Sequence, residues 1–317
     1  MYDRDVIFAT RAQCRWSLRR FGLMAAVLVT LAGCGTTQPP AETAVRPTAA
    51  QSQEAILTAV EADIDARRFQ LAQQRLAGLN AETVATARAR YAVAEVLLGL
   101  DRPKDALKEF EAVQTDEAFH ARAWQGMGQA LLAMGNTTAA ISQLNSALEA
   151  DPSLWRSWAA LGRAYDIEKR WSEAAAAYDK GLAVCPNPAL IVNNIGMSLL
   201  LQKQYAQAAA EFEKAMVQDP TLEAAKSNLR IALAWQGLYD QALAGLQQPE
   251  RPDALNNVGY VAMLRGDYKE AQQYFSQALE SSPTYHNSAA MNLEALRTLV
   301  KSKQPAQGPQ SAGGSAP

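Results

Sequence analysis

Three cysteines and two histidines are the side chains of this 317-residue chain best suited to nucleophilic or metal chemistry. The sequence contains no phosphate-binding loop, no His-Glu-x-x-His helix and no Gly-x-Ser-x-Gly turn. His120 and His286 are expected to be solvated surface residues. We expect Cys185 to be a half-buried structural residue, because no acidic or histidine partner can be recognised for it. The sequence therefore predicts that the chain is not an enzyme and has no cofactor or metal site.

Cys34 stands at the end of an N-terminal segment with the layout of a secretory signal. A pair of arginines precedes the apolar run 21–32, which is too short to span a membrane. The segment closes with Leu31-Ala32-Gly33-Cys34, which resembles the lipobox of bacterial lipoproteins. The resemblance implies cleavage before Cys34 and its acylation, including palmitate. Because Gly35 and not Asp follows, it also implies an outer-membrane lipoprotein facing the periplasm.

The composition favours helices and disfavours nucleic acid as a ligand. Alanine accounts for 62 residues, while aromatic residues make up only 7%. Alanine has the highest helix propensity, and strands prefer aromatic and β-branched residues. Residues 34–317 carry 25 basic and 30 acidic residues. A nucleic-acid binder or a polybasic membrane anchor would carry a basic excess, so the acyl chains on Cys34 are the only membrane attachment that we expect.

The sequence between residues 53 and 300 repeats itself with a period of 34. Glycine or another small residue, alanine, a large residue and proline recur at positions 8, 20, 24 and 32 of the repeat. The pattern resembles the tetratricopeptide repeat (TPR), in which two antiparallel helices bury their apolar faces by stacking on neighbouring repeats. It is best developed in residues 155–188, through Trp158, Leu161, Gly162, Tyr165, Trp171, Ala174, Tyr178 and Pro186.

The resemblance implies an all-α fold, a right-handed TPR solenoid with a C-terminal capping helix. Arg230 stands at position 8 of a copy that stops five residues early at Pro249, so we expect a local change in the stacking there. The expected segments are a cleaved signal 1–33, a lipidated cysteine and flexible tether 34–52, a TPR array 53–300 and a disordered tail 301–317. Within the array we expect repeats 53–86, 87–120, 121–154, 155–188, 189–222, 223–251 (shortened) and 252–285, then a cap 286–300.

A partner protein would bind the surface formed by the first helix of each repeat. In TPR proteins, positions 2, 5, 9, 12 and 13 line this groove, which here changes from polar and partly basic to apolar. Methionine and aromatic side chains suit an amphipathic or extended apolar segment, and recurring asparagines could bond its backbone. Alternatively, neighbouring repeats or the C-terminal tail cover the apolar residues. The candidate groove residues are Arg122, Arg156, Arg163, Asn193, Met197, Leu201, Ile231, Trp235, Asn256, Tyr260 and Met263.

Three segments, 188–201, 227–242 and 256–268, together resemble the TPR lipoproteins of tight-adherence (Tad, Flp-type) pilus assembly systems, the TadD kind. That resemblance implies a scaffold at the outer membrane that supports pilus assembly, with the secretin or another assembly component as its partner. Two alternatives remain open at this stage. One is a TPR adaptor for cell-wall enzymes or proteases, and the other is an accessory lipoprotein for outer-membrane protein assembly.

Overall fold

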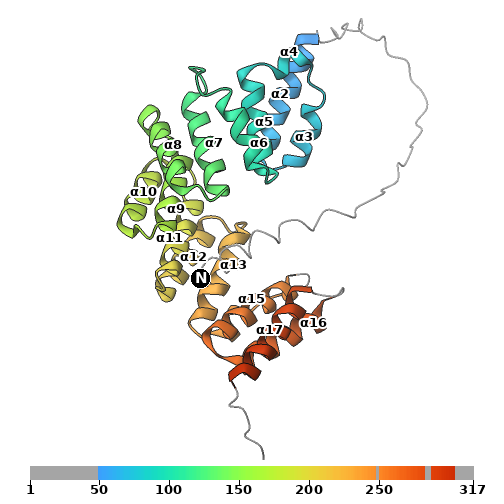
Figure 1. Ribbon diagram of the computed structural model, residues 1–317, viewed down its shortest axis with the longest axis vertical. Helices are drawn as coiled ribbons and strands as arrows, with labels where there is room; N and C mark the ends of the chain where they lie inside the picture. Colours follow the sequence, from blue (N-terminus) through green and yellow to red (C-terminus); the bar gives the residue numbers. More distant parts are fainter. Residues whose placement is uncertain (1–48, 248–249, 283–286, 304–317) are drawn as a thin grey trace, which may run out of the picture. The chain divides into compact units, whose positions relative to one another are not determined.

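The computed structural model describes residues 49–247, 250–282 and 287–303, and these residues form helices joined by short turns (Figure 1). We call the first helix of each repeat helix A and the second helix B. The A and B helices are α2 (Ala49–Asp65) and α3 (Phe69–Leu76), α5 (Ala87–Gly99) and α6 (Pro103–Glu111), α7 (His120–Ala133) and α8 (Thr137–Ala150), α9 (Trp155–Ile167) and α10 (Trp171–Val184), α11 (Ala189–Leu201) and α12 (Tyr205–Gln218), α13 (Glu223–Trp235) and α14 (Tyr239–Ala242), and α15 (Arg251–Arg265) and α16 (Tyr268–Ser281).

Two further helices complete the described part of the chain. α4 (Ala81–Val84) is a single turn between the first two pairs, and α17 (Asn287–Lys303) packs on α15 and α16. The helical ends extend beyond the expected boundaries. Residues 49–52, expected in the tether, begin α2, where the Gln53 side chain bonds the backbone of Gly78 and Asn80. Residues 301–303, expected in the tail, form the end of α17. The positive charges of Lys301 and Lys303 stabilise this end, because it is the negative end of the helix dipole.

The turn from helix A to helix B has the same backbone conformation in all seven described pairs. Position 15 of each repeat has a φ between 56° and 93°, in the left-handed region. Three of these residues are glycines, for which this conformation carries no Cβ penalty. The other four are Arg67, Asp101, Lys169 and Lys203, for which it is unfavourable. The packing of the two helices therefore holds these four residues in a conformation that they would not adopt alone.

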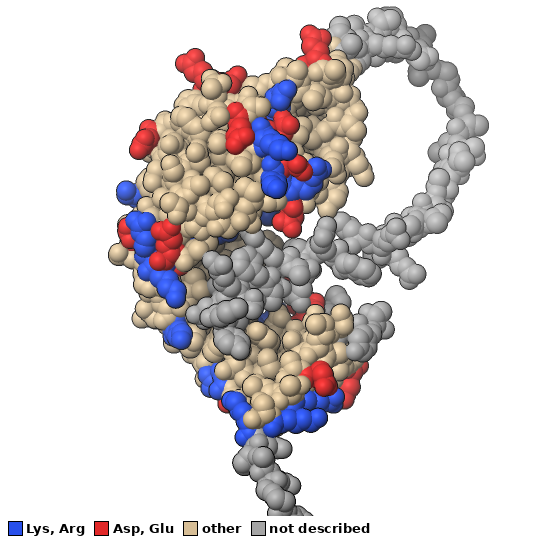
Figure 2. Space-filling view, viewed as in Figure 1, with Lys and Arg blue, Asp and Glu red and all other residues tan. Residues whose placement is uncertain are grey.

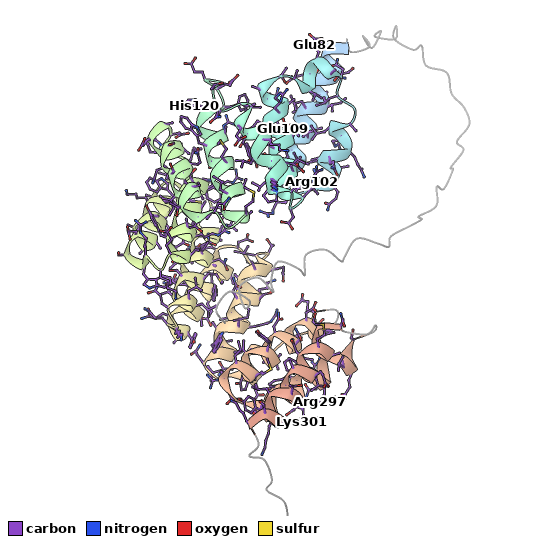
Figure 3. The ribbon with its side chains drawn as sticks, viewed as in Figure 1. Glu82, Arg102, Glu109, His120, Arg297 and Lys301 are labelled. Carbon is purple, nitrogen blue, oxygen red and sulfur yellow. The ribbon has the colours of Figure 1, made fainter. Side chains whose placement is uncertain are left out.

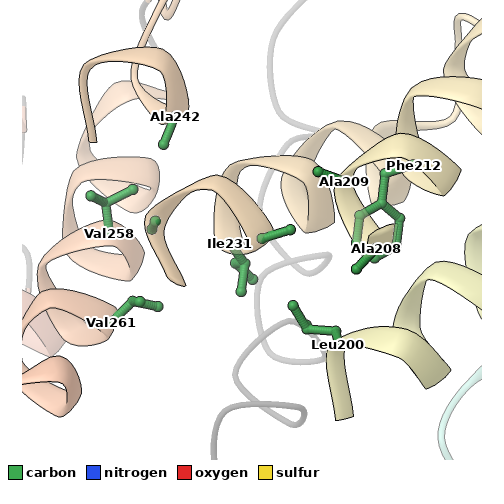
Figure 4. Packing of buried hydrophobic residues seen from close by; sticks show 10 residues of the cluster. Leu200, Ala208, Ala209, Phe212, Ile231, Ala242, Val258 and Val261 are labelled. Atoms are coloured by element: carbon green, nitrogen blue, oxygen red, sulfur yellow. The ribbon is translucent and has the colours of Figure 1, made fainter. Parts of the chain in front are cut away.

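Glycine at position 8 of helix A makes room for the large residue at position 24 of helix B in the same repeat. A Cβ built on Gly196 would lie 2.6 Å from the Phe212 ring, and one on Gly259 would lie 3.0 Å from the Phe275 ring. The Phe212 and Phe275 side chains are fully buried. Figure 4 shows one such cluster, in which Phe212 lies among the small and branched residues of α11 to α15. The large side chain at position 24 thus fills the space between the two helices of its own pair, in addition to any space between neighbouring repeats.

The helix B ends follow the prolines. α8, α10 and α12 each end two residues before a proline at position 32, which disfavours helix at the residue before it and cannot donate a backbone hydrogen bond. In the repeat 87–120, where Ala118 stands at that position, α6 already ends at Glu111. Pro249 and Pro283 lie outside the described residues.

The shortened repeat 223–251 has a helix B of only one turn, α14. Leu246, at position 24, is nevertheless buried although it lies beyond the helix. Arg230 occupies position 8, where four other repeats have glycine, and its guanidinium lies 3.5 Å from the Glu250 carboxylate. The next pair is fastened to this repeat by Arg265, which donates hydrogen bonds to the Trp235 carbonyl and the Tyr239 hydroxyl. These contacts join the shortened repeat to the pair formed by α15 and α16.

Candidate protein-binding surface

Each helix A contacts helix A of the next repeat, so these helices form one continuous layer. We call the exposed side of this layer the A-helix surface. All eleven candidate residues lie on A helices between α7 and α15. They fall into three groups: the exposed Arg122, Arg156 and Arg163, the half-buried Met197, Leu201, Trp235, Tyr260 and Met263, and the buried Asn193, Ile231 and Asn256.

The two buried candidate asparagines each bond an asparagine on a neighbouring helix. The Asn228 side-chain amide in α13 donates to Oδ1 of Asn193 in α11 at 2.9 Å, and the half-buried Asn292 side-chain amide in α17 donates to Oδ1 of Asn256 in α15 at 2.9 Å. Only 7% of Asn193 and 6% of Asn256 is exposed. Buried polar groups are costly unless they are paired, and these pairs account for the recurrence of asparagine without a ligand. The structure therefore places Asn193, Asn256 and the 7% exposed Ile231 inside the layer rather than on its surface.

Position 13, near the end of helix A, carries a row of apolar residues in the later repeats. Ile167 is 48% exposed, Leu201 and Leu264 are half-buried, and the Trp235 ring stacks on Tyr205 with the ring centroids 5.3 Å apart. Position 13 was one of those expected to line the groove, and Ile167 is the most accessible apolar residue of this row. Large apolar side chains left partly uncovered in neighbouring repeats form a candidate surface for a protein segment.

The earlier repeats have a basic and aromatic surface instead. The Arg122 guanidinium lies 5.6 Å from the centre of the Phe119 ring and 5.9 Å from that of Tyr91, and Arg156 lies 5.0 Å from the Trp155 ring. The Tyr91 hydroxyl donates to the Glu95 carboxylate at 3.1 Å. Burial raises the pKa of the Glu95 carboxyl above its usual range, although the Tyr91 hydrogen bond and the nearby Arg156 and Arg122 oppose that shift.

Position 12 was expected to line the groove, but in α9 it carries a buried carboxyl, that of Asp166. Asp166 is 5% exposed and accepts hydrogen bonds from the Ser198 hydroxyl at 2.6 Å and the Tyr178 hydroxyl at 2.7 Å. Burial raises the pKa of the Asp166 carboxyl, while these two hydrogen bonds and Arg163 lower it. The contacts join helix A and helix B of one repeat to helix A of the next. Most of the other repeats have an apolar residue at position 12. The acidic residue at this position was therefore the sign in the sequence that Asp166 makes a specific polar contact.

Many charged side chains elsewhere on the described surface form ion pairs. Figure 2 shows basic and acidic residues gathered in mixed clusters with uncharged areas between them. Arg102 bonds Asp105 on α6, and Arg297 lies 3.4 Å from Glu294 on α17; both arginines are marked in Figure 3.

His120, also marked in Figure 3, is half-buried against the Trp124 ring and contacts the Glu117 carbonyl oxygen through Nδ1. Cys185 is half-buried, as expected, with its sulfur 3.0 Å from the Asn187 carbonyl oxygen.

Several expectations fall outside the described residues. The signal segment 1–33, Cys34, most of the tether, His286 and residues 304–317 belong to this group. Across the described ranges, no helix combines the length and apolar character needed to cross a bilayer. Likewise, no three potential ligands among the described histidine, cysteine, aspartate and glutamate side chains come together at a metal-binding distance.

Comparison with known proteins supports the repeat assignment. Models of the tetratricopeptide repeat match residues 126–187 and 170–223, and a second such model matches residues 252–285. No curated protein sequence matches the chain.

Solved structures share the fold at low sequence identity. The Cut9 and Hcn1 assembly of APC/C matches with a TM-score of 0.57 and 17% identity over 77% of this chain, but the match spans only 49% of that chain. A TPR protein from Parabacteroides merdae gives a TM-score of 0.53 with 14% identity, covering 78% of this chain and 99% of the other. PilW, described as a type IV pilus biogenesis factor, gives 0.52 with 18% identity, covering 67% and 98%. The helix pairs, the repeat models and the shared fold together show that the described residues form a tetratricopeptide-repeat array.

Proposed function

We propose that this protein is an adaptor that holds a segment of a partner protein on its A-helix surface. The observation that carries the proposal is the row of partly exposed apolar residues at position 13, from Ile167 through Leu201 and Trp235 to Leu264. Successive repeats present these residues along one direction, as an extended or helical segment would require. Met197, Tyr260 and Met263 add half-buried, adaptable side chains to the same layer.

We further propose that the adaptor is anchored in the outer membrane by acyl chains on Cys34 and faces the periplasm. The signal layout and the lipobox sequence support this localisation, because several acyl chains on one cysteine anchor stably where a single chain does not. Replacing Cys34 with Ser should move the protein from the membrane fraction to the soluble periplasmic fraction. Retention of the variant in the outer-membrane fraction would contradict the lipid anchor.

The proposed cellular role is support of Tad/Flp-type pilus assembly, with the secretin or another assembly component as the partner. The support comes from the resemblance of residues 188–201, 227–242 and 256–268 to the Tad lipoproteins and from the lipobox. PilW shares the fold, which is compatible with this role.

The experiment is deletion of the gene followed by complementation with groove variants. A strain without the gene should lose normal secretin assembly and surface adherence, and the wild-type gene should restore both. Leu201→Lys places a charge in the apolar row and should fail to restore them. The matched control is Val217→Lys, because Val217 is 83% exposed on the helix B α12 and receives the same change. Normal secretin assembly in the deletion strain would rule out the pilus role.

A further inference from the structure

Most of the described arginines form ion pairs, whereas Arg122 and Arg156 on the A-helix surface do not. Arg68 and Arg75 share Asp63, Arg88 bonds Glu54 and Glu61, and Arg170 bonds Glu168 and Glu173 in the same way. Arg122 and Arg156 are exposed, and no described carboxylate lies within ion-pair distance of either. Both occupy position 2 of helix A in consecutive repeats.

Aromatic rings hold these two guanidinium groups in place. Arg122 lies over Phe119 and Tyr91, and Arg156 lies over Trp155. A ring restrains the side chain and attracts the cation while leaving the N–H groups at its edge able to donate. Glu95 interacts electrostatically with both arginines and Asp151 with Arg122, but Glu95 accepts a hydrogen bond from Tyr91, and Asp151 accepts hydrogen bonds from Ser153. The two arginines are thus ordered donors on an accessible surface.

The two segments that flank the array are poor candidates for the occupant. Residues 304–317 contain no aspartate or glutamate, and residues 35–48 contain a single acidic residue, Glu42. Neither segment can offer one carboxylate to each arginine. A partner with regularly spaced acidic residues satisfies both, because carboxylates match the planar guanidinium group in charge and geometry.

We propose that Arg122 and Arg156 bind an acidic segment of a partner protein, with one carboxylate on each guanidinium group. This inference rests on the proposed adaptor function and assigns the basic end of the same surface. Adjacent packed helices are about 8–10 Å apart, and a polyproline II segment has three residues per turn and advances about 3.1 Å per residue. Acidic residues three apart in such a segment lie on one face at about that spacing and therefore match the two arginines. The apolar part of the same partner would continue toward Leu201 and Trp235.

The test is an NMR titration of the full chain, in which the arginine Nε–Hε signals are followed during peptide addition. The probe is a synthetic peptide with a glutamate at every third residue in a Gly/Ser/Ala background. One control peptide has glutamine in place of glutamate, and another has the same glutamates in one uninterrupted block. We expect the Arg122 and Arg156 signals to shift with the spaced peptide and binding to weaken as salt is added. Loss of each arginine should weaken binding about tenfold.

The double variant Arg122→Gln, Arg156→Gln removes both proposed contacts. Arg102→Gln is the matched control, because it loses the same charge just before the helix B α6, where Arg102 bonds Asp105. Equal binding by the double variant, or equal binding of the glutamine peptide, would overturn the proposal. Stronger binding of the block peptide would overturn the spacing. An oligomer of this chain that dissociates only in the double variant would show a second copy to be the occupant, which also overturns it.

The experiments distinguish a failure of the acidic-segment inference from a failure of the adaptor proposal. If the spaced peptide does not shift the two arginines while Leu201→Lys still fails in complementation, the acidic-segment inference is wrong and the adaptor proposal stands. If Leu201→Lys complements fully, the apolar row is not the binding surface whatever the arginines bind.

Discussion

At the scale of single residues, position 15 shows how the fold imposes a conformation that the sequence does not favour everywhere. Gly135, Gly237 and Gly266 adopt the left-handed turn without steric penalty, whereas Lys203 adopts it with a φ of 62°. The turn is therefore a property of the repeat, and the residue at that position decides how much the conformation costs.

Replacing Lys203 with Gly should stabilise the protein. The left-handed conformation costs a residue with a Cβ about 1–2 kcal/mol, and part of that gain is lost because glycine is more flexible when unfolded. We expect the free energy of unfolding to rise by about 0.5–1 kcal/mol in urea denaturation. Lys203→Ala, which also removes the charge but keeps the Cβ, serves as the control. A Gly variant no more stable than the Ala variant would contradict the explanation.

Replacing Gly196 with Ala should destabilise the protein, because the new Cβ would stand 2.6 Å from the Phe212 ring. Overpacking of this kind costs about 1–3 kcal/mol. A second change, Phe212→Leu, makes room for the methyl group, so a double-mutant cycle should show that the two changes are not additive. Additive losses would mean that Gly196 is required for a reason other than the Phe212 ring.

At the scale of helices, Asp166 joins three elements through one buried carboxyl. Its pKa is raised in the folded protein above the 3.8 of an unperturbed aspartate, chiefly by burial. The folded state therefore binds the proton more tightly than the unfolded state. As the pH falls from above the folded pKa toward about 4, the contribution of this carboxyl to stability should increase.

Asp166→Asn removes that dependence while keeping an oxygen that can accept a hydrogen bond. We expect the variant to gain stability relative to the wild type at neutral pH and to lose this relative gain as the pH falls toward 4. Urea denaturation of both proteins at pH 7, 5.5 and 4 measures the difference. A relative gain that grows on acidification would show that the folded protein lowers the Asp166 pKa.

The helices and their pairing could be predicted from the sequence, but the side-chain contacts between them could not. The period of 34 predicted the helix pairs, because glycine, alanine and proline act locally and recur in phase. It did not predict the pairing of Asn193 with Asn228, because the partner of an asparagine depends on which side chain faces it across the layer. For the same reason, position 12 was expected to line the groove, whereas Asp166 at that position is buried against Tyr178 and Ser198. Helix ends such as Lys303 depend on contacts with distant residues, here the Tyr268 ring.

At the scale of the whole molecule, the A-helix surface combines a basic end with an apolar row. Arg122 and Arg156 belong to the third and fourth repeats, and the apolar row runs from Ile167 in the fourth repeat to Leu264 in the seventh. The candidate residues predicted from the sequence lie on one layer because the repeat fixes which helix each occupies. Which of them are exposed depended on the packing, which buries Asn193, Ile231 and Asn256.

The central claim is that a partner segment lies on the A-helix surface, and site-specific photo-cross-linking in living cells tests it most directly. A photoreactive amino acid at Leu201 should give a discrete adduct with one partner protein after irradiation. The same amino acid at Val217, exposed on α12, should give none. An adduct at Val217 but not at Leu201 would place the partner on the B helices and contradict the account.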